Sequence, residues 1–186
     1  MSKDIQHTEF LVIDLEATCW EKNQMPSTMI SEIIEIGYAI LKVNGNQILS
    51  HGSIIVKPER STISEFCTNL TTLTQEIVDR GVYFPEACRI LTLELNSFGR
   101  PWASYGNYDI KMLKDQCERL ELKYPMTPQH LNVKTMSTVL IGKRQGVGGT
   151  LTSLGLQFEG QQHRGGDDAF NIARILQEFT KRFKEV

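Results

Sequence analysis

Two long apolar runs joined by a short polar turn most constrain the fold of this chain. Residues 33–43 and 48–56 are rich in Ile and Val, and Asn44-Gly45-Asn46 lies between them. Asn-Gly between apolar runs is the strongest short-range signal for a β-hairpin. A third apolar run at residues 10–15 precedes the pair. The first third of the chain therefore predicts three strands, at least two of them antiparallel.

The rest of the chain predicts helices that alternate with two short strands. The expected helices lie at residues 64–70, 74–80, 85–98 and 108–120, in shorter pieces within 135–157, and at 166–184; the expected strands lie at 102–105 and 131–133. Three leading strands followed by alternating units indicate an α/β fold with a mixed sheet and helices packed on it. The length of 186 residues predicts a single domain over residues 1–186.

Two carboxylates, Asp14 and Glu16, end the first apolar run. Alternate side chains of a strand share a face, so Asp14 and Glu16 point the same way as Val12. Open α/β sheets place ligands at the carboxyl ends of their strands, and adjacent like charges repel unless a cation lies between them. D-x-E alone is a weak motif, and two solvated carboxylates at a strand end are the simpler interpretation of this pair.

Two further acids each head the apolar stripe of a predicted helix. Asp109 aligns with Met112, Leu113, Cys117 and Leu120, and Asp168 aligns with Ile172, Ile175, Leu176, Phe179 and Phe183. Burying an ionised carboxylate is costly unless it is paired or bound to a metal, so Asp168 needs a partner. Its neighbour Asp167 aligns with Asn171 and Arg174 and is predicted to face water. For Asp109, a favourable contact with the helix dipole is an alternative role.

A histidine, His163, precedes the last predicted helix across Arg164-Gly165-Gly166. Glycines at this point predict a mobile loop able to carry an imidazole toward a site. Histidine has an unperturbed pKa of about 6.5, which suits a general base near neutral pH. A surface histidine without a chemical role is the alternative.

The four carboxylates together predict a site for hard divalent cations. The sequence offers no cluster of Cys or His beside them, and oxygen ligands of this kind select Mg²⁺ or Mn²⁺ over zinc. Two such ions about 3.5 to 4 Å apart stabilise the attacking and leaving oxygens when a phosphodiester is cleaved.

Charge and cysteine content limit the classes of partner. A formal net charge of -2 excludes the broad basic surface of proteins that grip long duplexes, so any nucleic-acid contact should be local. Positive charge gathers in the C-terminal half at Lys134, Lys143, Arg144 and Arg164, where a solvated surface is the alternative to such a contact.

Four widely spaced cysteines, without a C-x-x-C pair, predict neither a zinc site nor a disulfide framework. The segment MSKDIQHTEF has no apolar signal core, and no apolar run approaches the roughly 20 residues that a membrane span needs. We therefore expect a soluble cytoplasmic protein with reduced thiols and no membrane contact.

Taken in order, these residues resemble the DEDDh family of 3′ to 5′ exonucleases. The pattern is Asp14-x-Glu16-x-Thr18, then Asp109 at a helix start, then His163 followed after four residues by Asp168. The segments FLVIDLEATCW, SEIIEIGYAIL, VKPERSTISEFCTNLTTLTQ, SYGNYDIKML and HRGGDDAFNIARIL are similar to one branch of this family. That branch contains the enhanced-RNA-interference and histone-mRNA 3′ exonucleases and their bacterial relatives, and the resemblance covers about residues 8–183.

The resemblance implies an RNase H-like fold, with a mixed five-stranded sheet and helices on both of its faces. It also implies removal of nucleoside 5′-monophosphates from single-stranded 3′ ends of RNA, with two Mg²⁺ or Mn²⁺ ions in the site. The implied metal ligands are Asp14, Glu16, Asp109 and Asp168. His163 is the implied general base, and Glu16 would also orient the nucleophile.

The resemblance further implies contacts with the substrate from Glu16, Ala17, Thr18 and His163, with the backbone of Ala17 meeting the terminal nucleotide. Three alternatives stay open. In one, the carboxylates hold only structural calcium, which would leave His163 without a role. A DNA 3′ exonuclease or a scavenger of very short oligonucleotides would use the same ions and base, because only a contact with the 2′-hydroxyl separates RNA from DNA. A non-catalytic RNA-binding or regulatory module would have lost a metal ligand or the base, whereas all five positions are filled here.

Overall fold

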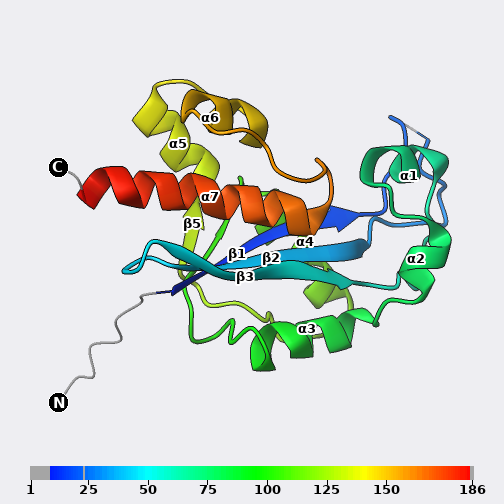
Figure 1. The fold of residues 1–186 in the computed structure, drawn as a ribbon. Helices are drawn as coiled ribbons and strands as arrows, with labels where there is room; N and C mark the ends of the chain where they lie inside the picture. Colours follow the sequence, from blue (N-terminus) through cyan, green and yellow to red (C-terminus); the bar gives the residue numbers. More distant parts are fainter. Residues whose placement is uncertain (1–8, 23, 185–186) are drawn as a thin grey trace, which may run out of the picture.

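The core of the protein is a five-stranded mixed sheet, shown in Figure 1. The computed structural model describes residues 9–22 and 24–184. Residues 1–8, part of the segment for which the sequence predicted no signal core, lie outside the described residues. The strands are β1 (Glu9–Ala17), β2 (Ile33–Lys42), β3 (Gln47–Ile55), β4 (Trp102–Ser104) and β5 (His130–Asn132). They lie in the order β3-β2-β1-β4-β5. The first three pair antiparallel and the last two join in parallel, which confirms the predicted hairpin and mixed sheet.

Helices cover both faces of the sheet. They are α1 (Glu65–Thr71), α2 (Gln75–Asp79), α3 (Phe84–Leu93), α4 (Tyr108–Arg119), α5 (Val133–Ile141), α6 (Val147–Ser153) and α7 (Gly165–Lys184). Figure 1 shows α7 lying along one face and α3 along the other. This arrangement confirms the RNase H-like architecture that the resemblance implied.

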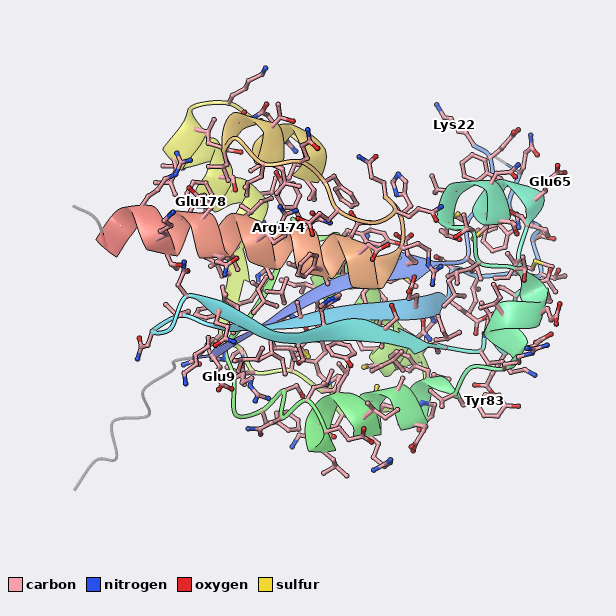
Figure 2. The ribbon with its side chains drawn as sticks, viewed as in Figure 1. Glu9, Lys22, Glu65, Tyr83, Arg174 and Glu178 are labelled. Carbon is pink, nitrogen blue, oxygen red and sulfur yellow. The ribbon has the colours of Figure 1, made fainter. Side chains whose placement is uncertain are left out.

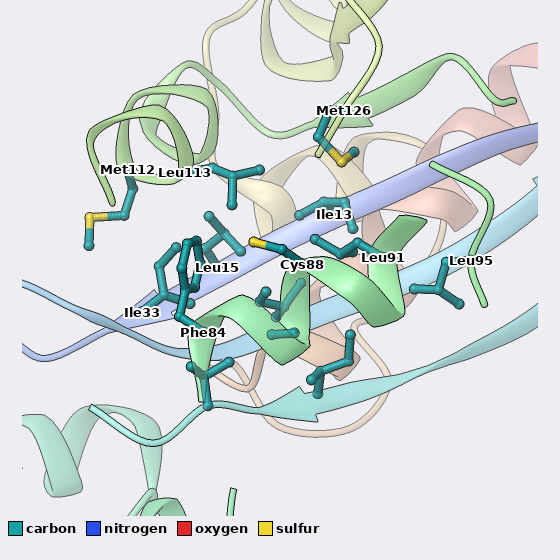
Figure 3. Close-up of a cluster of buried hydrophobic side chains, with 14 of the residues drawn as sticks. Ile13, Leu15, Ile33, Phe84, Cys88, Leu91, Leu95, Met112, Leu113 and Met126 are labelled. Carbon is teal, nitrogen blue, oxygen red and sulfur yellow. The ribbon is translucent and has the colours of Figure 1, made fainter. Parts of the chain in front are cut away.

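Two apolar layers follow from the alternation of side chains along β1. Leu11, Ile13 and Leu15 are buried with residues of α3 and α4, and Figure 3 shows Ile13 and Leu15 within this cluster. Val12 instead packs in a second layer with residues of α5, α6 and α7. Asp14 and Glu16 are on the same face of β1 as Val12, because alternate side chains of a strand share a face. They therefore lie on the face that α7 covers.

Two predicted elements have other bounds in the structure. The helix predicted at 85–98 ends at Leu93, because the chain turns back at Asn96, which has a φ of 47°. The amide of Ser97 then donates to the carbonyl of Leu91 at 3.0 Å, which closes the helix end. The strand predicted at 131–133 begins and ends one residue earlier, since Val133 already starts α5 after Asn132 caps it.

Backbone meets backbone where α7 begins. A Cβ at Gly37 of β2 would lie 1.8 Å from the carbonyl carbon of Gly165, and a Cβ at Gly166 would lie 2.5 Å from the hydroxyl oxygen of Ser53. Only glycine permits so close an approach. The first turn of α7 is therefore pressed onto β2 and β3, beside the carboxyl end of β1.

Within the part of the chain that the structure describes, no helix has both the length and the apolar character needed to cross a membrane.

Candidate metal centre at the carboxyl end of the first strand

Three carboxylates meet where β1 ends and α7 begins. One oxygen from each of Asp14, Glu16 and Asp168 lies within 4.8 Å of the other two. Asp14 and Glu16 come from the same face of β1, and Asp168 comes from the first turn of α7. Oxygens bound to one Mg²⁺ at about 2.1 Å lie up to about 4.2 Å apart, so this spacing is close to that of a cation's ligand shell.

Asp109 approaches from the other side of β1. It stands in the first turn of α4 with 4 % of its surface exposed, and its carboxylate accepts a hydrogen bond from the amide of Leu15 at 3.0 Å. That amide is free because β4 is short and pairs with β1 only at Leu11 and Val12. Asp109 lies outside the group of three oxygens, although its charge acts strongly on Asp14.

Burial and mutual repulsion make these acids hard to ionise in the absence of a cation. Burial, followed by the charges of Asp109, Asp168 and Glu16, raises the pKa of Asp14 well above its usual value. Burial first, and the charge of Asp168 next, raise the pKa of Glu16 to about 8.

The pKa of the other two acids is raised less, because backbone amides stabilise their charge. Burial raises the pKa of Asp109 to about 6 against the opposing effect of the Leu15 amide. Burial also raises the pKa of Asp168 to about 6, and the amide of His163 opposes it. A hard divalent cation fits this all-oxygen donor set, since it would replace the repulsion by attraction.

His163 lies in the turn that leads into α7, with a φ of 61° and an exposed side chain. Its backbone amide donates to a carboxylate oxygen of Asp168 at 2.7 Å. The predicted mobile loop after it is wrong, because Gly165 and Gly166 are buried in the first turn of α7. These glycines serve the close approach to β2 and β3 rather than flexibility.

Asp167 does not simply face water, as its helical phase predicted. Its carboxylate accepts a hydrogen bond from the amide of Gln161 at 2.8 Å. Asn171, on the same face, is fully buried, and its amide group bonds both the amide and the carbonyl of Glu159. The face that was predicted to be polar therefore holds the segment before His163 in place.

Arg174 also binds that segment, and it is labelled on α7 in Figure 2. Its guanidinium donates to the carbonyl of Gln157 at 2.8 Å and forms an ion pair with Glu159 at 2.8 Å.

Sequence reasoning missed a buried ion pair beside the site. Glu35 of β2 is fully buried and lies opposite Glu16 in the β1–β2 ladder. Its carboxylate accepts hydrogen bonds from the guanidinium of Arg164 at 3.2 and 3.3 Å, from the amide of Gly165 at 2.9 Å, and from the hydroxyl of Ser53. A carboxylate within the apolar run IIEIGYAIL was the available signal, because such a charge needs partners.

Ala17 and Thr18 differ in what they can offer a ligand. Ala17 is buried at the end of β1, where the register shifts and pairing with β2 becomes irregular. Thr18 is 1 % exposed, and its hydroxyl bonds the carbonyl of Ile30 and the amide of Glu32. The Thr18 side chain therefore has a structural role in the 18–32 connection, and the implied substrate contact of Thr18 stays a prediction.

The sequence profile of the exonuclease (RNase_T) family matches residues 11–176. A 3′-5′ exoribonuclease 1 from Rattus norvegicus is 34% identical over 194 residues, which span 92% of this chain and 53% of the relative. The chain thus spans about half the length of the 3′-5′ exoribonuclease 1 relatives from Rattus norvegicus, Homo sapiens and Mus musculus.

Solved structures give the same picture. The nuclease domain of 3′hExo, described as a DEDDh family member bound to rAMP, has a TM-score of 0.83 and 29% identity, covering 95% of this chain and 94% of that one. A 3′-exonuclease described in 3′-end specific recognition of a histone mRNA stem-loop also has a TM-score of 0.83, with 28% identity, covering 95% of this chain and 65% of that one.

The raised pKa of Glu16 predicts a pH dependence of stability in the absence of divalent cations. Its folded-state pKa of about 8 exceeds the unfolded value of 4.5, so the folded protein holds a proton that the unfolded chain has lost between these pH values. This contribution to stability is present below the unfolded pKa and is lost as pH rises to about 8. Urea unfolding in excess chelator should therefore show a steeper decline of stability from pH 5 to pH 8 in wild type than in Glu16→Gln.

Glu65→Gln is the control for the loss of one charge, because Glu65 is an exposed acid on α1. Its stability should follow the wild-type pH profile. Parallel profiles for wild type and Glu16→Gln would contradict the raised pKa.

Proposed function

Because this chain belongs to the exonuclease (RNase_T) family, we propose that it is a metal-dependent 3′ to 5′ exoribonuclease that acts on single-stranded 3′ ends and releases nucleoside 5′-monophosphates. The meeting of Asp14, Glu16 and Asp168 within 4.8 Å carries the proposal. Carboxylates with only a structural role would lie apart or pair with basic side chains. Here burial and the charge of Asp168 raise the pKa of both Asp14 and Glu16, which makes a cation the natural partner of the group. The relatives named as 3′-5′ exoribonucleases support RNA as the substrate.

The proposed ligands of the divalent cations are Asp14, Glu16 and Asp168, with Asp109 completing the set from α4. Mg²⁺ or Mn²⁺ is the proposed ion, since every donor is a carboxylate oxygen. When bound, a pair of such ions would stabilise the attacking and leaving oxygens of the phosphodiester.

His163 is the proposed general base. In hydrolysis the oxygen of water forms a bond to phosphorus, and the imidazole takes the proton of the water. The bond from phosphorus to the 3′-oxygen of the preceding nucleotide breaks, and that oxygen takes a proton from solvent to give a new 3′-hydroxyl. The exposed turn gives His163 access to this water, and the bond from its amide to Asp168 fixes the turn beside the acids. Glu16 would help to orient the water, and the backbone of Ala17 would meet the terminal nucleoside.

Localisation in the cytoplasm stays a prediction. It is supported by the four cysteines, each of which is a free thiol.

Single-stranded RNA labelled at either end tests the proposed reaction. With Mg²⁺ or Mn²⁺, a 3′ label should appear at once as a mononucleotide, while a 5′-labelled strand should shorten one nucleotide at a time. A DNA strand of the same sequence measures the preference for RNA. Cleavage in excess chelator, or internal cuts in a circular RNA, would sink the proposal.

His163→Ala should lower kcat by about 10² to 10⁴, the usual contribution of general acid-base catalysis. Steady-state kinetics should show KM changed little, because the imidazole lies outside the group of acidic oxygens. Gln162→Ala is the matched control, since Gln162 is the exposed neighbour on the same turn. Near-normal turnover by His163→Ala would remove the histidine from the mechanism.

The adjacent acids of α7 should respond differently to the same substitution. Asp168→Asn should lower kcat by about 10³-fold or more, because the loss of a cation ligand forfeits several kcal/mol of charge stabilisation. Asp167→Asn should turn over close to wild type, since an amide oxygen can still accept the hydrogen bond from Gln161.

Stability should move independently of this activity. Melting in excess chelator should show Asp168→Asn at least as stable as wild type, because one of the repelling charges is gone. An active Asp168→Asn, or an Asp167→Asn as inactive as its neighbour, would show that the assignment of the two acids is wrong.

A further inference from the structure

A pocket of about 530 Å³ lies beside the acidic site, where β4 and β5 end. Its walls come from the residues that follow these strands and from α5, and they include Tyr105, Asn107, Tyr108, Asn132, Lys134 and Arg144. The carboxyl ends of the parallel strands β1, β4 and β5 share one edge of the sheet, so this pocket and the acids lie along the same edge. Its volume falls within the roughly 300–1,000 Å³ of pockets that hold small ligands.

The pocket carries positive charge that the protein does not neutralise. Lys134 and Arg144 line it, and no carboxylate does. Within residues 9–22 and 24–184 neither cation has an ion-pair partner, and the ammonium of Lys134 lies 5.9 Å from the centre of the Tyr105 ring. By contrast, Arg164, which precedes α7, and the two arginines of α7, Arg174 and Arg182, are all in ion pairs. Two cations without an ion-pair partner among the described residues therefore line this one pocket.

The four basic residues that the sequence analysis grouped in the C-terminal half have different environments in the structure. Lys134 and Arg144 line the pocket, Lys143 is exposed outside its lining, and Arg164 is bound to Glu35.

The wall nearest the acids is continuous with them. Tyr108 lines the pocket with 56 % of its surface exposed, and the next residue in the chain is Asp109. Asn107 accepts a hydrogen bond from the side chain of Asn132 at 2.9 Å, which joins the start of α4 to the end of β5. The wall of the pocket is therefore followed directly in the chain by one of the four acids.

Hydrogen bonds fix the opposite wall. The hydroxyl of Tyr105 donates to the carbonyl of Gln145 at 3.0 Å and lies 2.6 Å from the hydroxyl of Thr150. These contacts hold the turn that carries Arg144. The side chain of Asn132 accepts the amide of Thr135 at 2.9 Å and so caps α5. The walls that present the two cations are thus held in place by the protein itself.

We propose that this pocket binds the phosphodiester backbone of the single strand on the 5′ side of the scissile bond. This proposal rests on the proposed exonuclease function. It implies that the enzyme prefers strands with nucleotides upstream of the scissile bond over the shortest oligonucleotides. Lys134 and Arg144 contact the phosphates, while the carboxamides of Asn107 and Asn132 offer further polar groups. The rings of Tyr105 and Tyr108 offer surfaces on which bases stack without regard to sequence.

The size of the substrate tests this inference. One substrate is the p-nitrophenyl ester of uridine 5′-monophosphate, which has no upstream nucleotide, and the other is single-stranded octauridylate. The selectivity is the ratio of kcat/KM for the octamer to kcat/KM for the ester. A solvent-accessible charge contributes about two- to fivefold to binding, and Lys134 is half-buried while Arg144 is exposed. Lys134→Ala/Arg144→Ala should therefore lower this selectivity by about 4- to 25-fold. Lys143→Ala removes a neighbouring charge outside the pocket and should preserve the selectivity.

Salt dependence gives a second measurement. The slope of log kcat/KM for the octamer against log salt should become shallower by about 0.7 for each phosphate contact that is lost. Unchanged selectivity or slope in the double variant, or an equal effect of Lys143→Ala, would overturn the assignment of the pocket.

Binding separates this inference from the proposed function. Fluorescence anisotropy of labelled octauridylate in excess chelator measures affinity without hydrolysis. The double variant should bind the octamer more weakly than wild type and Lys143→Ala do. If wild type hydrolyses neither substrate, the proposed function fails. If wild type and the double variant bind the octamer with equal affinity, the assignment of the pocket fails, whether or not the protein hydrolyses RNA.

Discussion

Repulsion between carboxylates at the end of β1 is the interaction on which the rest of the structure depends. Asp14, Glu16 and Asp168 share a space less than 5 Å across, and Asp109 adds its charge from the other side of β1. Such a cluster opposes folding, because burial and the charges of neighbouring acids both raise the free energy of each ionised carboxylate. The two apolar layers around β1 supply the rigidity that keeps the acids together.

Specific contacts between elements then set the position of each acid. The Leu15 amide holds Asp109 because β4 stops short, and the amide of His163 holds Asp168. The Glu35–Arg164 ion pair ties the turn of His163 to β2, next to Glu16 in the ladder. His163 and the acids are thus positioned by the same few contacts.

Much of this could be predicted from the sequence, because periodicity reports which side chains share a face. The apolar phase of β1 and the alignment of Asp168 with the core stripe of α7 were of this kind, while the hairpin at Asn44-Gly45 followed from its turn residues. Contacts between distant segments have no such period. The fit of Gly165 against Gly37 and the pairing of Arg164 with Glu35 depend on how α7 meets β2, which local patterns do not encode.

The backbone contact of Gly37 with Gly165 also sets a lower limit to the distance between the start of α7 and the sheet. Side chains between packed elements can change rotamer and absorb small displacements, whereas two backbones in contact have no such compliance. The distance from Asp168 to β1 is then set by the thickness of the peptide chain itself. Heating should leave that distance almost constant until α7 separates from the sheet, so inactivation should be an abrupt, cooperative event rather than a gradual drift.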